Sequence, residues 1–394
     1  MADYYEFDVD KINSITKQHS KKVKVKLRSL NSSDETIGEI NGFCTGGSLD
    51  ITNSDLVRRS INLQFVANNS LEINEKSPFW INKRIQIFTG IEDYKKDTYW
   101  INQGIFIPTQ PQTSVALTGR TISISAMDKM ILADSQVLAT TIVSFCKNYD
   151  LNNSKCKTCT RENCDSFSPR YTGEAIQELA KLYGETKFLI NNIGEVLPYN
   201  YEMAAGDSIQ DAIKEITNMY MNYECYYNVN GYLVFDKMRN RINDASVWDF
   251  VNENDFTISR NITADYTKVY NDFKIFGYYD DETGKQPSYQ ITIEDSNHPF
   301  SVRNMGRTHS LVISEDNYVT EEQCKVRAEY EKQCAENLIN NFSLTVAPIY
   351  SLNNVNRVVI VSDNDNRYVC VIDSITYPLD VVSPMNINCH EIFI

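Results

Sequence analysis

The sequence lacks the features of a membrane or exported protein. It has no apolar run that approaches the roughly 18 residues of a membrane-spanning helix. The first six residues, Met1 to Glu6, are polar and acidic and contain no apolar core of a signal peptide. We therefore expect no membrane span and no targeting signal.

Positive charge is also in short supply. The 394 residues include 38 basic and 52 acidic side chains, which gives a net charge of −14. A chain of this sign is a poor candidate for wrapping nucleic acid, because phosphate binding needs clustered Lys and Arg. The acidic balance suits a surface to which DNA should not stick, although ordinary solubility is the simpler explanation of the charge alone.

Recognisable catalytic motifs are missing as well. The four histidines are His19, His298, His309 and His390. None of them lies near a nucleophile-elbow motif or a zinc-protease motif, and the chain has neither a dinucleotide fingerprint nor a Walker A loop. Paired carboxylates carry no weight among 52 acidic residues. We therefore expect that the protein is not an enzyme.

What the sequence does have is a mostly β pattern in three parts. Residues 1–134 begin with a loose arm (1–20) and continue with alternating strand patterns, interrupted by a proline-containing connector at 108–111. Residues 135–244 form a small α/β unit, with helices that begin at Thr172 and Ser208 and an Asn230-Gly231 hairpin. Residues 245–394 return to strands around a long helix over 320–341. No sequence repeat is evident, yet two β-rich parts around an insert leave a structural duplication open.

Four of the ten cysteines are clustered, and they are the chemically specific feature of the chain. Cys146, Cys156, Cys159 and Cys164 fall within a polar loop over 146–164. Thiolates are soft ligands, and four of them suit tetrahedral zinc or an iron–sulfur cluster. The spacing matches neither the common zinc-ribbon nor the ferredoxin pattern, so free or disulfide-paired thiols are the alternative. A bound metal would be structural, because four protein ligands leave no open position for substrate.

The other six cysteines stand in apolar patterns, and we expect them to be small buried hydrophobic residues: Cys44, Cys225, Cys324, Cys334, Cys370 and Cys389.

Several short segments, in this order along the chain, carry a family resemblance. Residues 201–237 run from Tyr-x-x-Ala-Gly-Asp-Ser through an amphipathic helix into Tyr-Tyr-Asn-Val-Asn-Gly-Tyr-Leu-Val-Phe. The segments 47–50 with 58–63, 269–277 and 347–394 fit the same pattern. Together these segments span most of the chain. Their order along the chain resembles that of the tail baseplate hub proteins of phages of Gram-positive bacteria.

The resemblance implies a fold, an assembly and a location. The expected fold is α+β but mostly β, with two tail-tube-like antiparallel β-barrel or sandwich domains around the small α/β unit. The expected assembly is a homotrimeric virion structural protein. It would join a tail tube or distal tail protein to a central spike or tip protein and adapt sixfold to threefold symmetry, with the tape measure protein as a further partner.

Such a protein is assembled in the host cytoplasm and resides in the tail baseplate or tip of the virion. The cysteine cluster departs from the usual hub pattern, although some siphophage tail-tip proteins at the hub position hold an iron–sulfur cluster through cysteines.

Two other functions remain open at this stage. A tail-tip receptor-binding or glycan-binding protein could use exposed aromatic residues, although core packing is the favoured role for the tyrosines concerned: Tyr220, Tyr223, Tyr226 and Tyr227. A metal-dependent hydrolase built on the four cysteines would need an open coordination position and a nearby general base.

Overall fold

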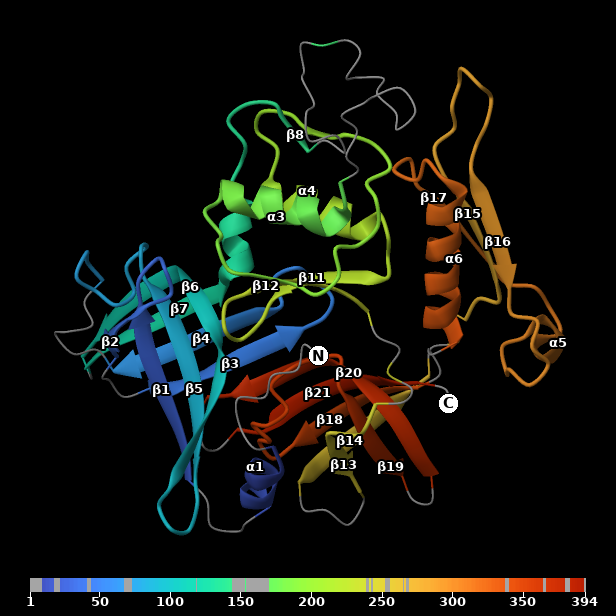
Figure 1. Ribbon diagram of the computed structural model, residues 1–394. Coiled ribbons are helices and arrows are strands. Elements are labelled where there is room, and N and C mark those ends of the chain that lie inside the picture. Colours follow the sequence, from blue (N-terminus) through green and yellow to red (C-terminus); the bar gives the residue numbers. More distant parts are fainter. Residues whose placement is uncertain are drawn as a thin grey trace.

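The structure is a computed structural model, and it describes most of the chain. The described residues are 9–17, 22–40, 44–66, 73–117, 119–143, 153, 170–238, 241, 244–251, 256–264, 266, 269–336, 340–363, 366–379 and 383–392. They contain many strands and few helices (Figure 1), so the mostly β prediction is confirmed. No helix in these ranges is both long enough and apolar enough to cross a membrane.

One large sheet organises the molecule. Among the described residues it has 13 strands, and its main path runs β14-β18-β21-β20-β3-β4-β7-β6-β5-β1-β2, with β19 and β13 attached to β20. The strands from the first part of the chain are β1 (Lys22–Leu30), β2 (Thr36–Glu39), β3 (Cys44–Thr52), β4 (Arg59–Val66), β5 (Arg84–Glu92), β6 (Thr98–Ala116) and β7 (Gly119–Asp128). Those from the last part are β13 (Trp248–Phe250), β14 (Thr257–Thr263), β18 (Asn341–Val346), β19 (Val358–Asp363), β20 (Asn366–Pro378) and β21 (Met385–Glu391).

The two β-rich parts are joined edge to edge. Ser374 to Pro378 of β20 pair antiparallel with Ser48 to Thr52 of β3. Alternation places one side chain in two on the apolar side of this sheet, and the buried residues of both parts form a single core. Leu49 and Leu344, one from each part, are fully buried in that core. The join was not foreseen from the sequence.

Within the sheet, each part contributes four strands in the same arrangement. The first unit is β3-β4-β7-β6 and the second is β14-β18-β21-β20, each antiparallel throughout. The bulges match too: β3 and β14 each carry one extra residue near their start, at Thr45 and Ile258, and β6 and β20 each carry one in mid-strand, at Thr109 and Asp373. The duplication left open above is therefore present in the pairing pattern.

The middle of the chain packs above the large sheet (Figure 1). This middle unit consists of β8 (Thr141–Val143), α3 (Thr172–Leu182), β9 (Phe188–Ile190), β10 (Tyr201–Met203), α4 (Ile209–Asn218), β11 (Tyr223–Tyr227) and β12 (Leu233–Lys237). A 3-10 helix, η2 (Lys129–Asp134), leads into it from β7. The predicted hairpin is confirmed, because β11 and β12 pair antiparallel around Gly231, whose φ is +74°.

A smaller unit stands beside the middle unit. It is a three-stranded sheet of β15 (Asp272–Phe276), β16 (Ser288–Thr292) and β17 (Ser310–Ser314), with the short helix α5 (Val302–Met305). Helix α6 (Glu321–Glu336) packs on β15 and β16. Tyr318 and Cys324 lie in the core between them.

Four local predictions are wrong in detail. The first residues are not all a loose arm, because α1 (Val9–Thr16) buries Ile12 and Ile15 in the main core. The predicted connector at 108–111 belongs to β6, which continues through both prolines. The described part of α6 ends at Glu336 rather than 341, because Asn341 begins β18. Helix α3 is preceded by extended Tyr171, so Thr172 is its first residue and not its cap.

Candidate functional site: a polar sheet face

The face of the large sheet opposite the core carries short polar side chains. Directly opposed residues on neighbouring strands point to the same side, so the eight strands of the two four-strand units present one continuous surface. We call it the polar face, and it comprises Ser48, Asp50, Thr52, Ser60, Asn62, Gln64, Gln110, Gln112, Ser114, Thr121, Ser123, Ser125, Ser259, Asn261, Thr263, Asn341, Ser343, Thr345, Ser374, Thr376, Asn386, Asn388 and His390. None of these residues is buried.

Cross-strand hydrogen bonds hold parts of this face in place. Ser125 donates to the Asn62 side chain over 2.7 Å, and the Asn388 amide donates to Ser374 over 2.9 Å. The first bond joins β7 with β4 in the first unit, and the second joins β21 with β20 in the second unit. The polar side chains thus satisfy one another and also remain accessible to solvent.

Fixed charge is almost absent from the polar face. Asp50 is its one carboxylate, and it accepts a hydrogen bond of 2.7 Å from Thr376 across the β3–β20 join. His390, at one end of the face, contacts both oxygens of Asp373 over 2.9 Å. The face therefore offers many weak hydrogen-bonding groups and no cluster of cations that would hold a polyanion.

Two adjacent arginines fasten the sheet to the loops behind it. Arg59 is almost fully buried and donates to the backbone oxygens of Gln103 and Asn353, so it links β6 with the chain after β18. Burial, together with the neighbouring positive charge of Arg58, lowers the pKa of Arg59 to about 10. Because its neutral partners are carbonyl groups, the guanidinium acts as a hydrogen-bonding brace inside the core.

Arg58 links the sheet to the middle unit. Its guanidinium carbon lies 3.6 Å from the centre of the Tyr226 ring, and Nη2 is 2.8 Å from the Glu224 carboxylate. The same carboxylate accepts from Asn356 over 3.2 Å, which brings in the last part of the chain. The three parts of the protein therefore meet at this arginine.

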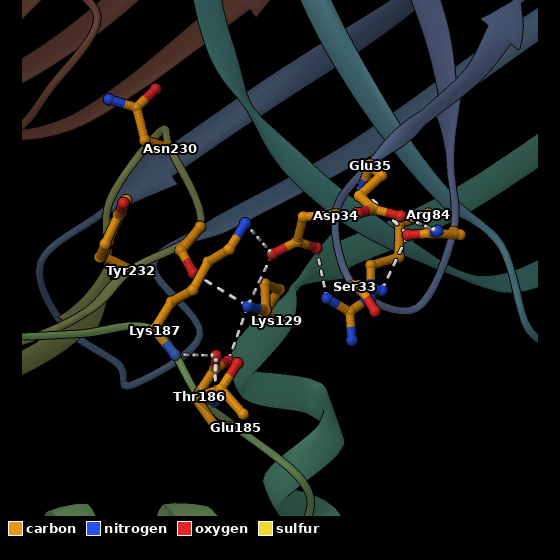
Figure 2. Close-up of polar contacts among 12 residues, drawn as sticks. Ser33, Asp34, Glu35, Arg84, Lys129, Glu185, Thr186, Lys187, Asn230 and Tyr232 are labelled. Carbon is orange, nitrogen blue, oxygen red and sulfur yellow. Dashed lines mark hydrogen bonds and ion pairs between the residues drawn. The ribbon is translucent and has the colours of Figure 1, made fainter.

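A second junction lies at the tip of the β11–β12 hairpin and is shown in Figure 2. The Lys129 ammonium, 1% exposed, is 3.1 Å from Asp34, 2.6 Å from Glu185 and 2.9 Å from the Gly231 oxygen. Its three protons thus have three acceptors, from the β1–β2 turn, the loop after α3 and the hairpin. This lysine is therefore a second charged link between the sheet and the middle unit, beside the Arg58–Glu224 pair.

Further contacts of Asp34 complete that junction. Arg84 donates to it from β5, and the Lys187 ammonium lies 3.1 Å away. Burial on its own raises the pKa of the Asp34 carboxyl, but Lys129 and Arg84 outweigh that effect and hold the pKa below its ordinary value. Asp34 is thus charged at neutral pH in a buried position.

The four cysteines predicted as metal ligands, Cys146, Cys156, Cys159 and Cys164, lie outside the described residues. Within the ranges given above, no group of three or more His, Cys, Asp or Glu side chains is arranged to hold a metal ion. The four-cysteine site therefore stays a prediction.

Of the remaining cysteines, Cys225, Cys324, Cys370 and Cys389 are buried as expected, whereas Cys334 is only half-buried on α6. The side chain of Cys44 is outside the described set.

The aromatic residues considered for glycan binding are interior residues. Tyr220, Tyr223, Tyr226 and Tyr227 have exposed fractions of 9%, 3%, 6% and 1%. Tyr223 stacks on Phe235, and the Tyr227 hydroxyl donates to Glu185 over 2.7 Å. The predicted core packing is confirmed, and these side chains offer no surface to a sugar.

The polar face was not predicted from the sequence, although the sequence contains a pattern that indicates it. Strands such as β4 alternate Ile61, Leu63 and Phe65 with Ser60, Asn62 and Gln64. The polar positions are almost all uncharged, which is unusual for a solvent-facing strand. The restriction of these outward positions to Ser, Thr, Asn and Gln is the pattern from which the polar face could have been predicted.

Comparison with known proteins places this fold among tail proteins. No protein-family model matches the sequence, and no curated protein matches it.

The solved structures that resemble this one include three tail proteins. The 43 kDa tail protein of prophage MuSo2 from Shewanella oneidensis superposes with a TM-score of 0.60 at 14% identity, over 93% of this chain and 98% of that one. The tail protein from Neisseria meningitidis MC58 gives 0.61 at 10% identity, over 93% and 96%. The prophage tail protein gp18 from Listeria monocytogenes gives 0.53 at 11% identity, over 93% and 94%.

These similarities extend over nearly the full length of both partners, so they concern the whole arrangement of the two repeated units, the middle unit and the side sheet. The chain has the fold of phage and prophage tail proteins, and the resemblance drawn from its sequence segments is confirmed at the level of that fold.

Proposed function

We propose that this chain is a structural hub of a phage tail or a phage-derived particle, in which the polar face lines a central channel. The observation that carries the proposal is the polar face itself: 23 side chains over eight strands, with one carboxylate, one histidine and no Lys or Arg. A polyanion that slides along such a surface meets hydrogen-bonding groups that water can replace and no cations that bind phosphate.

The repeated units support a role in symmetry adaptation. Each chain holds two equivalent four-strand units, so three chains around an axis present six similar modules. A ring of six modules matches a sixfold tail tube on one side, while the threefold arrangement of chains matches a trimeric spike or tip on the other. The proposed partners are therefore the tube or distal tail protein and the central spike or tip protein, with the tape measure protein inside the channel.

The work of this hub is assembly rather than catalysis. The proposed location is the baseplate or tip of the virion. The predicted four-cysteine centre, with zinc or an iron–sulfur cluster, would fix the polar loop that leads into the middle unit.

Co-expression with a tube protein and a spike protein tests the hub role. Native mass spectrometry should detect complexes that contain three copies of this chain. A chain that remains monomeric and binds neither protein would refute the proposal.

Charge placed on the polar face tests the channel role. Asn62→Arg and Asn388→Arg should leave particle assembly intact and reduce DNA delivery, because each particle would carry several added cations on the path of the DNA. Asn297→Arg, in an exposed turn before α5 and away from the polar face, is the matched control. Equal DNA delivery by all three variants would argue against a channel on this face.

A further inference from the structure

Two strand edges at the borders of the polar face are left open in the described part of the chain. β14 pairs with β18 on one side and has no strand on the other within the described part of the chain. β6 pairs with β5 through residues 98–106, but in the described ranges residues 107–116 pair with β7 alone. Open edges present unpaired backbone groups, which natural proteins usually cover or pair.

Apolar side chains stand exposed at both of these edges. Ile258 and Ile262 of β14 are 64% and 39% exposed. Val115 of β6 and the following Leu117 are 78% and 108% exposed. Apolar groups at two separate open edges of one sheet indicate surfaces that are covered in an assembly.

The chain contains its own example of how such edges meet. By the repeat, β20 is equivalent to β6 and β3 is equivalent to β14, with the bulges in matching positions. Inside the chain, the second half of β20 pairs antiparallel with β3, and the Leu379 amide continues the ladder by donating to the Gly47 oxygen over 2.9 Å. The open part of β6 is therefore equivalent to the part of β20 that pairs with β3, and the open edge of β14 is equivalent to the edge of β3 that pairs with β20. In the described part of a single chain, both of these open edges lack the strand that their equivalents pair with.

We infer that the β6 edge of one copy pairs antiparallel with the β14 edge of a second copy of this chain, in the register of the β20–β3 join. This inference rests on the proposed assembly of several copies around a channel. Transfer of the register places Gln112 opposite Thr263, Thr113 opposite Ile262, and Ser114 opposite Asn261, counted from the pairs that Thr376, Tyr377 and Pro378 make with Asp50, Leu49 and Ser48.

This register satisfies the chemistry of both faces. Gln112 and Ser114 stand beside Thr263 and Asn261, so the polar face continues from copy to copy without a break. On the other side, Ile262 comes opposite Thr113 and Val115 comes opposite Arg260, so Val115 and Ile262 become diagonal neighbours and part of their apolar surface is removed from water. Pro111 has no backbone N–H to donate, so it marks the end of the hydrogen-bonded pairing.

Engineered disulfides test the register. In the internal join the hydrogen bond at Leu379–Gly47 makes the adjacent Pro378–Ser48 pair a non-hydrogen-bonded one, and such pairs bring Cα atoms to about 4.5 Å. This separation falls in the range of disulfides. Ser114→Cys combined with Asn261→Cys should therefore link chains covalently under mild oxidation, and peptide mapping should recover the 114–261 link.

The matched control is Ser114→Cys with Ile262→Cys, because the side chain at 262 points to the opposite face of the sheet. The unsubstituted chain controls for its ten natural cysteines. We expect most of the 114–261 variant to run as covalent multiples and both controls to run as single chains. Mixing the two single variants should give the same link, which shows that it joins different copies.

Light scattering on the same samples separates the two levels of the proposal. Trimers that form without the 114–261 link would overturn the edge pairing and leave the hub role standing. Monomers under all conditions would overturn both. A 114–261 link in open chains rather than trimers would support the edge pairing and contradict threefold closure.

Discussion

Replacement of Lys129 by methionine tests the junction between the sheet and the middle unit. Methionine keeps most of the buried volume and removes the ammonium, so the Asp34 and Glu185 carboxylates lose a partner at 3.1 Å and 2.6 Å. Asp34 retains Arg84 and Lys187, whereas Glu185 retains hydrogen bonds from Tyr227 and two backbone amides. Most of the loss of stability should therefore come from Glu185, which is left without a cationic partner among the described residues.

Removal of one partner from a buried ion pair typically costs about 3–5 kcal/mol. The retained contacts place Lys129→Met at the lower end of that range, at about 3 kcal/mol. Urea unfolding followed by circular dichroism measures the loss. Lys76→Met, in an exposed turn, is the control and should stay within about 0.5 kcal/mol of the unsubstituted protein.

A second substitution locates the origin of that loss. Glu185→Gln in the Lys129→Met background removes the carboxylate left without its cation, so it should recover part of the lost stability. A loss below about 1 kcal/mol for Lys129→Met would be the value of a surface pair and would refute the account of a buried charged link.

Three further outcomes are expected. Gly47→Ala should lower the free energy of unfolding by at least about 2 kcal/mol, because φ of Gly47 is +147° and an added Cβ would lie 2.1 Å from the Asn62 backbone oxygen. Gly46→Ala is the control and should change little, because no atom of the described residues lies within 4 Å of an added Cβ there. Equal unfolding midpoints for the two variants would contradict this reasoning. Burial raises the pKa of Asp128 to about 6, above the unfolded value of about 3.9, so the folded state holds a proton that the unfolded state has lost. The stability of the unsubstituted protein relative to Asp128→Asn should therefore fall by about 2 kcal/mol from about pH 4 to about pH 6, out of a total loss of about 3 kcal/mol between about pH 3 and about pH 7. A flat difference in urea titrations would exclude this account. Cys156→Ser should lower thermal stability and the content of bound zinc or iron, with no catalytic activity to lose; unchanged melting and particle yield would count against the four-cysteine centre.

Local patterns predicted the parts of the fold that depend on neighbouring residues. The Asn230-Gly231 pair predicted the hairpin, because its turn needs positive φ. Ser208 predicted the start of α4, and its side chain accepts from the Asp211 amide. These signals act over a few residues and are therefore legible in one sequence.

Features that depend on distant contacts were not predictable in the same way. Pro108 and Pro111 were assigned to a connector, because proline interrupts most strands. In the structure they lie in a strand with one open edge, where a missing N–H costs no internal hydrogen bond. Nothing in the local pattern of β3 shows that it pairs with β20.

The polar face occupies an intermediate position. Its strands and their inward residues were predicted from alternation, but its continuity across the molecule arises only from the join between β3 and β20. For the cysteine cluster, the sequence predicts the chemistry, which is a metal centre with four thiolate ligands. The four cysteines lie outside the described residues, so that prediction is not tested by the structure.

The join between β3 and β20 also has a consequence for synthesis. The bond between Asp50 and Thr376 spans 326 residues, so β3 is made early and its partner is among the last strands to leave the ribosome. Until then the nascent chain exposes an open strand edge of the same form as the β14 edge. Pairing over such a separation is slow, and an unpaired edge is prone to association. Crowded nascent chains can therefore pair β3 with the β6 edge of a neighbour, which makes translation rate and chaperone supply determinants of the yield of correctly folded protein.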